Sequence, residues 1–384
     1  MAGLEEKMAD LPLDEPMQPI SHCEFSGERP NLEWKACTVD DCQSFARFLP
    51  IPQQISMEKK PSHLFKQHSD EWHKLRNERL TASNLSCVLG FFEPSTVKML
   101  KLNPQYYVNH QRVVHMASTM RQRVHSPQSV NESFDFPESV KTAMKWGSNH
   151  ELNGILTFLQ GFNEFYVKET GLWSFTLEKL PASCAKLGVE FSHLPAIGAS
   201  PDGLVCRLKD GDPVEYFSEK EEVVSLLEIK CPCPFKEKKM ARKEEISAIS
   251  EQAIASSNNQ YTYVKMRPHP SVPSYYMPQL QCQMLVTGAK QCYYVCWTPT
   301  AGAKVYQVDF DDEYCGIMLL LIKNFYERFV LPKIEIVPSE DFFFNHPEYA
   351  GFVNRTIALA CESKLVKDVK DVVVGGREEP LFHS

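Results

Sequence analysis

The sequence predicts an α/β fold in which a mixed β-sheet is flanked by helices, and three observations support this prediction. First, short β-branched segments bounded by turn residues alternate with longer stretches of helical periodicity. Second, 43% of the 384 residues are hydrophobic, which is enough for a sizeable core. Third, residues 198–232 contain a turn and two strand patterns, which we expect to form a hairpin.

We expect the chain to divide into three segments. Residues 1–60 are rich in Pro, Glu and Asp with little periodicity, so they are predicted to be a partly disordered extension. Residues 61–345 contain the regular elements and form the main domain. Residues 346–384 are predicted to be a C-terminal tail that is mobile from Ser363 onward.

Helices and strands are predicted on both sides of the hairpin. Apolar residues recur at helical spacing over residues 64–79 and 138–162, and Pro278 starts a further helix that stops at Gly288. Strand composition and helical periodicity give the remaining elements. The strands are residues 165–175, 185–191, 291–298 and 304–310, and the last long helix is residues 311–331.

Composition limits the classes of function. The net charge is −8, so binding to DNA would require a local basic groove rather than a basic protein. The apolar run at residues 317–322 is far shorter than the roughly 20 residues of a membrane helix. The acidic start of the chain is unlike a signal or transit peptide, and the 13 cysteines suggest reduced thiols. We expect an intracellular protein of the nucleus or cytoplasm, neither secreted nor bound to a membrane.

The hairpin places charged side chains together. Residues 201–203 are Pro, Asp and Gly, a turn sequence, and residues 223–231 have the pattern of a strand. Because side chains alternate along a strand, Glu228 and Lys230 share one face. The hairpin also brings Asp202 near Glu228.

These charges predict a metal site. Two neighbouring carboxylates repel each other, and a hard cation such as Mg²⁺ relieves the repulsion. We expect Asp202, Glu228 and the backbone carbonyl of Ile229 to hold Mg²⁺, with Mn²⁺ as a substitute. Lys230 is then placed to hold or polarise a water molecule.

A second polar group lies near the start of the main domain. Arg76 belongs to a predicted helix, and Ser83 lies at the start of the next one. Taken singly, Arg76 is most simply a solvated helix residue, and Ser83 or Thr81 a helix cap. Alternatively, a guanidinium, a hydroxyl and free backbone amides form an anion site that suits a terminal phosphate.

An acid followed by Glu-x-Lys on a strand resembles the PD-(D/E)XK nuclease site, although this short motif is a weak signal alone. Three further motifs accompany it, and their order and spacing resemble the YqaJ viral recombinase family over residues 64–332. These motifs are Trp72-x-x-x-Arg76-x-x-x-Leu80-Thr81-Ala82-Ser83, Trp146-Gly147-x-x-x-Glu151 and Pro278-Gln279-Leu280-Gln281.

The resemblance implies a restriction-endonuclease-like core and a nuclease domain over residues 61–345. It implies a metal-dependent deoxyribonuclease, similar to phage lambda exonuclease, that digests duplex DNA ends 5′ to 3′ in recombination or repair. Glu151 becomes a third acid of the metal site, and Gln281 lies by the water that Lys230 positions. Arg76, Ser83 and Ser200 become the 5′-phosphate site. A ring-shaped homotrimer, which the N-terminal extension would obstruct, and a single-strand annealing protein as partner are also implied.

Two other classes of function stay open. A structure-selective or nicking endonuclease would use the same core, and circular plasmid DNA separates it from an exonuclease, which needs an end. The other class is a DNA-binding recombination module without catalysis. The intact Asp202, Glu228 and Lys230 argue against this module.

Overall fold

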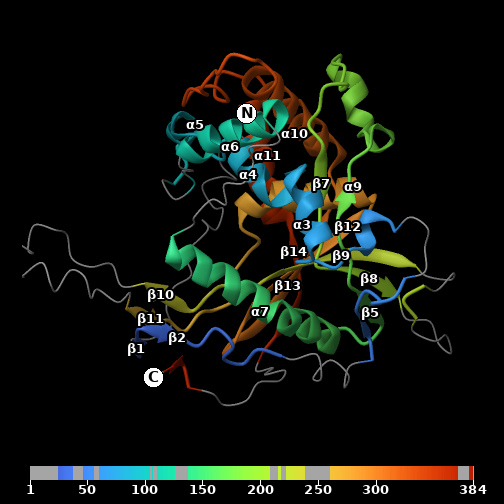
Figure 1. The fold of residues 1–384 in the computed structure, drawn as a ribbon, viewed down its shortest axis with the longest axis vertical. Helices are drawn as coiled ribbons and strands as arrows, with labels where there is room; N and C mark the ends of the chain where they lie inside the picture. Colours follow the sequence, from blue (N-terminus) through green and yellow to red (C-terminus); the bar gives the residue numbers. More distant parts are fainter. Residues whose placement is uncertain are drawn as a thin grey trace, which may run out of the picture.

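The computed structural model describes residues 25–37, 46–55, 60–103, 106, 110–126, 137–207, 215–217, 222–237, 260–370 and 380–383. A seven-stranded mixed sheet runs through the molecule with helices on both faces (Figure 1), which confirms the predicted fold class. In spatial order its strands are β14 (Lys364–Val369), β13 (Gly302–Asp309), β12 (Gln291–Thr298), β9 (Val223–Lys230), β8 (Gly203–Arg207), β5 (Phe165–Lys168) and β3 (Phe48–Leu49).

Strand β9 lies at the centre of this sheet. On one side it pairs antiparallel with β8, so the predicted hairpin is present. On the other side it pairs parallel with β12, which puts Glu228 opposite Tyr294 and Lys230 opposite Cys296. A parallel pair requires a long crossover connection, and this one carries α9 (Met277–Thr287).

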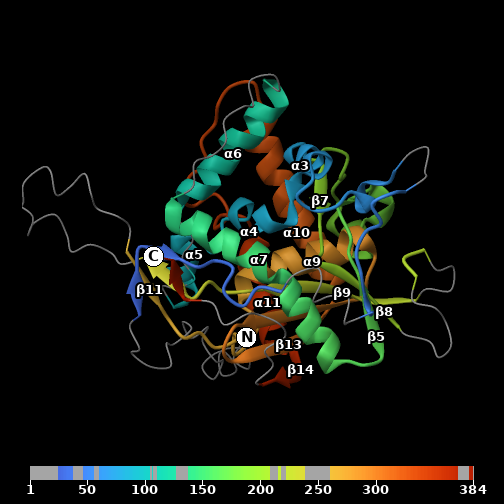
Figure 2. The same cartoon turned by 60° about the horizontal axis from the view of Figure 1, so that its bottom comes forward.

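Helices cover both faces of the sheet, as Figures 1 and 2 show. One face is covered by α7 (Glu138–Gly161), and the other by α9, α10 (Asp312–Phe325) and α11 (Tyr349–Glu362). Successive side chains of β9 enter different cores: Leu227 and Ile229 pack with residues of α7, whereas Leu226 packs with residues of α9 and α10. The strand thus positions alternate residues toward α7 and α9.

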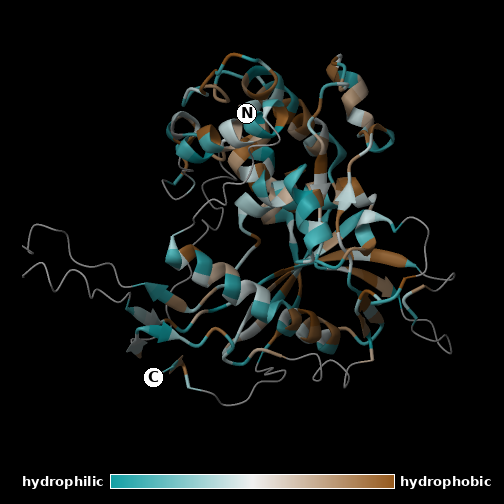
Figure 3. Ribbon diagram, in the orientation of Figure 1, coloured by the Kyte–Doolittle hydropathy of each residue, from teal (hydrophilic) through white to brown (hydrophobic). Residues whose placement is uncertain are grey.

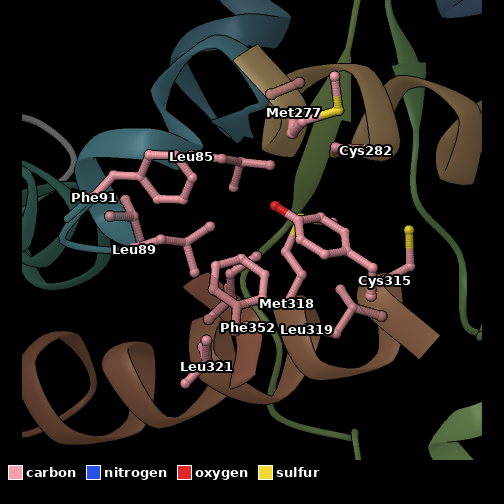
Figure 4. Close-up of a cluster of buried hydrophobic side chains, with 14 of the residues drawn as sticks. Leu85, Leu89, Phe91, Met277, Cys282, Cys315, Met318, Leu319, Leu321 and Phe352 are labelled. Carbon is pink, nitrogen blue, oxygen red and sulfur yellow. The ribbon is translucent and has the colours of Figure 1, made fainter. Parts of the chain in front are cut away.

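The core on the α9 side is the larger of the two. It gathers α9, α10 and α11 against the short helix α4 (Leu85–Val88) and against α6 (His110–His125). The strands of the sheet are largely hydrophobic in Figure 3, and Figure 4 shows side chains of α4, α9, α10 and α11, with two from the segment after α4, packed together. Figure 4 labels Leu85, Leu89, Phe91, Met277, Cys282, Cys315, Met318, Leu319, Leu321 and Phe352. This packing fixes α9 against the central strand.

The other described elements are short. Three small sheets have the strand orders β1-β11-β10, β15-β2 and β4-β7-β6. Their strands are β1 (Ser26–Gly27), β2 (Arg29–Pro30), β4 (Leu80–Thr81), β6 (Trp173–Ser174), β7 (Ile197–Ala199), β10 (Phe235–Glu237), β11 (Tyr261–Tyr263) and β15 (Phe382–His383). The helical elements are η1 (Ser62–Leu64), α3 (Asp70–Asn77), η2 (Ala82–Asn84), α5 (Pro94–Met99), η5 (Leu177–Lys179), η6 (Ala182–Leu187), η8 (Ser274–Tyr276) and the π-helical η9 (Tyr326–Val330).

Two predictions in the first half of the chain are wrong. The helix predicted over residues 64–79 begins only at Asp70, because His68 has a φ of 67° and the Ser69 hydroxyl then accepts a hydrogen bond from the Trp72 amide. The strand predicted at residues 185–191 is instead the end of η6 and an irregular segment. The predicted helices at 138–162, 278–286 and 311–331 are confirmed by α7, α9, and α10 with η9.

The structure also differs from the prediction in the two terminal segments. Residues 346–384 do not form a tail in their described part, because α11 packs into the larger core and β14 pairs with β13. Within the predicted extension, β3 pairs with β5 at the far edge of the main sheet. In the described parts of the chain, no helix has the length and apolar character needed to cross a membrane.

Candidate active site

Glu228 is buried on the central strand and is held by three donors. Lys230 Nζ lies 2.5 Å from Glu228 Oε1, and Gln279 Nε2 donates to the same oxygen at 2.5 Å. Gln283 Nε2 donates to Oε2 at 2.6 Å. Glu228 and Lys230 therefore share one face of β9, as predicted, and this face points toward α9.

Asp202 reaches the same strand from the turn before β8. Its Oδ2 accepts a hydrogen bond from the Ile229 amide at 2.6 Å, and its own amide donates to the Leu227 carbonyl at 3.0 Å. Burial raises the pKa of Asp202 well above its usual range, and the charges of Glu228 and Glu151 raise it further. Acidic side chains are therefore gathered at the end of β9.

Glu151 approaches from the other face of the sheet on α7. A Cβ atom on Gly154 would lie 2.3 Å from Ile229 Cγ2, so the helix needs a glycine to lie this close to β9. Burial, then the charges of Glu228 and Glu169, raise the pKa of Glu151 to about 7. Glu169, which follows directly on β5, is not among the predicted site residues. The antiparallel register of β5 and β8 carries it toward Gly203 and the Asp202 turn.

Lys230 lies between acidic groups and an aromatic ring. Its Nζ is 4.9 Å from the centre of the Tyr276 ring, at the end of η8. Burial acts to lower the pKa of Lys230, but the charges of Glu228 and Asp202 outweigh it and raise the pKa above its usual value. Lys230 Nζ is thus placed as a hydrogen-bond donor beside the carboxylates.

The prediction that Gln281 lies beside the carboxylates is wrong. Its Nε2 donates to the Asp309 carbonyl at 2.8 Å, and its Oε1 accepts from the Asp311 amide at 2.9 Å. Residues four apart on a helix share a face, so Gln279 and Gln283 point together at Glu228 while Gln281 points elsewhere. The spacing of four residues between Gln279 and Gln283 is the feature of the sequence that identifies these two glutamines as the partners of Glu228.

The residues predicted to bind a terminal phosphate are joined by contacts. Arg76 Nη2 donates to Ser83 Oγ at 3.4 Å, and its guanidinium lies 4.3 Å from the centre of the Trp72 ring. Trp72 Nε1 donates to Ser200 Oγ at 3.0 Å, two residues before Asp202. Burial lowers the pKa of Arg76, and the charge of Glu228 opposes this shift. The guanidinium is therefore within electrostatic range of the acidic site.

Helix capping does not account for Ser83. Both η2 and α4 lie within the described residues, and neither has a side-chain hydrogen bond at its N-cap. Ser83 is exposed. Its hydroxyl accepts a hydrogen bond from Arg76 Nη2 and lies 3.2 Å from Thr81 Oγ1. Arg76 and Ser83 thus form a polar pair at the surface beside Trp72.

The carboxylates fit a hard divalent cation. The charge of Glu228 raises the pKa of both Asp202 and Glu151, and a cation relieves such repulsion. In the described part of the chain, no three His, Cys, Asp or Glu side chains are grouped so that they could hold a metal by themselves. Mg²⁺ commonly takes one or two carboxylates and completes its shell with other oxygens and water. Asp202 and Glu228 would therefore hold it with the Ile229 carbonyl and water.

The structure thus combines a mixed sheet flanked by helices with Glu228 and Lys230 on its central strand and Asp202 at the turn before β8. The family model described as YqaJ-like viral recombinase domain matches residues 71–290, which is more than half of the chain. The chain belongs to this family, and the resemblance seen in the sequence is confirmed. Arg76, Glu151, Asp202, Glu228 and Lys230 all lie within the matched range.

Solved structures to which the chain is similar include an alkaline exonuclease (LHK-Exo) from Laribacter hongkongensis. It is 19% identical with a TM-score of 0.37, and the match covers 67% of this chain and 91% of that chain. The complex of LHK-Exo with dAMP is 21% identical with a TM-score of 0.35 and has the same coverage, 67% and 91%. No curated protein matches the chain. Membership rests on the family match alone.

Proposed function

We propose that this protein is a Mg²⁺-dependent deoxyribonuclease of recombination or repair that digests duplex DNA from 5′ ends. One observation carries the proposal: Glu228 and Lys230 share a face of the central strand, and Asp202 is hydrogen bonded to that strand at Ile229. Buried carboxylates suit a hard cation, and Lys230 adds a fixed positive charge. Membership in a recombinase family supports DNA as the substrate.

The groups of the chain have separate tasks in this proposal. Asp202, Glu228 and the Ile229 carbonyl would hold Mg²⁺, with Glu151 assisting from α7. When bound, Mg²⁺ supplies Lewis-acid chemistry that activates a water molecule and stabilises charge on the scissile phosphate. Lys230, which its acidic neighbours keep charged, donates hydrogen bonds that orient the attacking water or stabilise the phosphate oxygens.

The 5′-to-3′ polarity is implied by the family resemblance, and the contacts of Arg76 are compatible with it. A guanidinium and a hydroxyl on one side of the site suit a phosphate that carries the extra charge of a chain end. Ser200 links this position through Trp72 to the turn of Asp202. A terminal-phosphate site favours an exonuclease over an endonuclease, which does not need an end.

Two expectations about assembly stay predictions. The family resemblance implies a ring-shaped homotrimer and a single-strand annealing protein as partner. Part of the N-terminal extension is tied into this chain's own sheet by β3, so the extension does not lie wholly outside the domain.

Digestion of end-labelled linear duplex DNA with and without Mg²⁺ tests the proposed function. We expect Mg²⁺-dependent release of label, no digestion of circular plasmid, and loss of hydrolysis in Asp202→Ala and Glu228→Ala with DNA binding retained. Each variant removes a carboxylate that would hold the cation. Substantial Mg²⁺-dependent activity in either purified variant would contradict the assignment of Asp202 and Glu228 as metal ligands. Cleavage of circular plasmid would favour an endonuclease.

A further inference from the structure

We infer that Gln283 is a positioning residue that fixes the Glu228 carboxylate for cation binding, an inference that rests on the proposed function. Gln283 lies on α9, one helical turn after Gln279, and only 1% of it is exposed. Its Nε2 donates to Glu228 Oε2 at 2.6 Å. Among the described residues, Gln283 is the side chain that donates to Oε2, whereas both Lys230 and Gln279 donate to Oε1.

The second polar atom of Gln283 argues against a packing role. Its Oε1 is buried and has no hydrogen-bond partner among the described residues. An unpaired buried acceptor costs free energy, and an apolar side chain of similar length would fill the same space without that cost. The charge-assisted hydrogen bond to Glu228 offsets the cost, because a bond to an ionised group is stronger than one between neutral groups.

The contact with Glu228 also favours one orientation of the Gln283 amide. If the amide were reversed, Gln283 Oε1 would face Glu228 Oε2, and two acceptors would meet in a buried place. In the observed orientation Gln283 Nε2 donates to Glu228 Oε2, so the amide holds the carboxylate in place. Gln283 thus acts on the reaction through Glu228 and not by touching the substrate.

Gln281 supplies a matched comparison on the same helix. It is as buried as Gln283, but both ends of its amide are bound to backbone groups, one at the end of β13 and the other at the N-cap of α10. Gln281 therefore joins α9 to the connection between β13 and α10, whereas Gln283 joins α9 to a carboxylate of the site. Substitution of Gln281 should therefore lower stability, whereas substitution of Gln283 should lower the affinity for the cation.

Gln279 supplies a second comparison. Because Lys230 also donates to Glu228 Oε1, loss of Gln279 leaves that oxygen with a donor. Loss of Gln283 leaves Oε2 without its described donor. Groups that hydrogen-bond a metal-ligating carboxylate typically account for about 10–100-fold in metal affinity or activity. We therefore expect the larger effect at Gln283.

The test compares Gln283→Met, Gln281→Met and Gln279→Met in the full chain. Methionine keeps the length of the side chain and removes the amide. Mn²⁺ is titrated by calorimetry without DNA, and thermal unfolding is followed without metal. Gln283→Met should weaken Mn²⁺ binding roughly 10–100-fold and raise the Mg²⁺ concentration for half-maximal digestion, while its metal-free unfolding temperature stays near that of the wild type. Gln281→Met should unfold at a lower temperature with unchanged Mn²⁺ affinity.

If Gln283→Met binds Mn²⁺ as tightly as the wild type, the inference is wrong. It is also wrong if Gln279→Met loses as much Mn²⁺ affinity as Gln283→Met does. If Gln283→Met does not fold, Gln283→Asn takes its place, because it keeps an amide but withdraws it from Glu228. Weakened Mn²⁺ binding in Gln283→Asn supports the inference, and unchanged binding overturns it. If the wild type binds Mn²⁺ but does not digest DNA, the proposed nuclease function is wrong, while the comparison of Mn²⁺ affinities among the glutamine variants still tests the role of Gln283. A wild type that does not bind Mn²⁺ would end both.

Discussion

At the scale of the residue, Lys230 combines an ion pair with an aromatic contact. The carboxylates keep it charged, and the Tyr276 ring lies beside its ammonium group. Lys230→Met should lower kcat by about 10²–10³-fold, as for other lost transition-state donors. DNA affinity should change little, because the contact is strongest in the transition state.

Single-turnover digestion and a separate DNA-binding assay measure the two effects of Lys230→Met. Lys186→Met is the control, since Lys186 is exposed and lies 3.8 Å from Glu313, away from the site. A Lys230→Met variant that cleaves normally but binds DNA poorly would make Lys230 a phosphate anchor instead.

At the scale of the element, the proposed site for a terminal phosphate combines Arg76 of α3 with Ser83 of η2. We expect the wild type to prefer a 5′-phosphate end over a 5′-hydroxyl end. Arg76→Ala should slow digestion of phosphorylated ends by about tenfold to a hundredfold, because one charge-assisted hydrogen bond is lost. It should also reduce the ratio of the rate on 5′-phosphate ends to the rate on 5′-hydroxyl ends. Initial rates on matched duplexes measure both quantities.

Arg79→Ala controls for general loss of charge near this proposed site. Arg79 donates to Ser174 Oγ at 3.2 Å and to the Leu75 carbonyl at 2.8 Å, so it serves the local fold rather than the proposed site. Arg79→Ala should keep the preference for phosphorylated ends. Equal wild-type rates on the two ends would remove Arg76 from end recognition and favour an endonuclease.

The approach of α7 to β9 depends on Gly154. A methyl group there would meet the side chain of Ile229, next to Glu228. Gly154→Ala should lower the free energy of unfolding by about 1–3 kcal/mol and slow digestion, because overpacking displaces the strand or Glu151. Denaturant unfolding and the digestion rate measure these effects.

Gly147→Ala is the matched control on the same helix. A Cβ atom on Gly147 would have no neighbour within 4 Å. This variant should gain up to about 1 kcal/mol from helix propensity and keep its activity. If Gly154→Ala behaves like Gly147→Ala, the close approach does not constrain the site.

The predictability of each element follows from its local signals. The helices α7 and α9 were predictable because their apolar periods are long and are bounded by Pro or Gly. Residues 185–191 were not, since a short apolar run fits a strand or a helical turn equally well. Strand β14 was missed because Lys364, Lys367 and Asp368 look like a solvated tail, yet edge strands commonly carry such charges.

The candidate site was predictable where its residues are close in sequence. Glu228 and Lys230 share a strand face by simple alternation, and Asp202 follows from the hairpin. Glu169 required the register of β5 against β8, which no local pattern supplies. The family resemblance points to Gln281, whereas the helical period pairs Gln279 with Gln283.

At the scale of the whole molecule, the acidic site makes stability depend on pH. The pKa of Glu151 rises from 4.5 to about 7, so the folded protein holds a proton in this window that the unfolded chain releases. The free energy of unfolding without metal should therefore fall as pH rises from 4.5 to 7, and Asp202 acts in the same direction. Cation binding needs deprotonated carboxylates, so Mg²⁺ should stabilise the protein more above this window than within it.

Thermal unfolding in EDTA and in Mg²⁺, at pH values within and above this window, measures this dependence. Glu151→Gln is the control, since its amide does not titrate and should flatten the pH dependence in EDTA. An equal Mg²⁺ effect at both pH values, or a Glu151→Gln curve that follows the wild type, would contradict the assignment of these carboxylates to a cation.

The central position of β9 has a consequence for hydrogen exchange. The sheet has three strands on each side of β9, so the backbone amides of β9 are protected until the sheet opens from an edge. We expect the amides around Glu228 to exchange with deuterium only through global unfolding, and those of the edge strands β3 and β14 to exchange through local opening. We therefore expect Glu228 and Lys230 to lie in the part of the chain that loses its structure last.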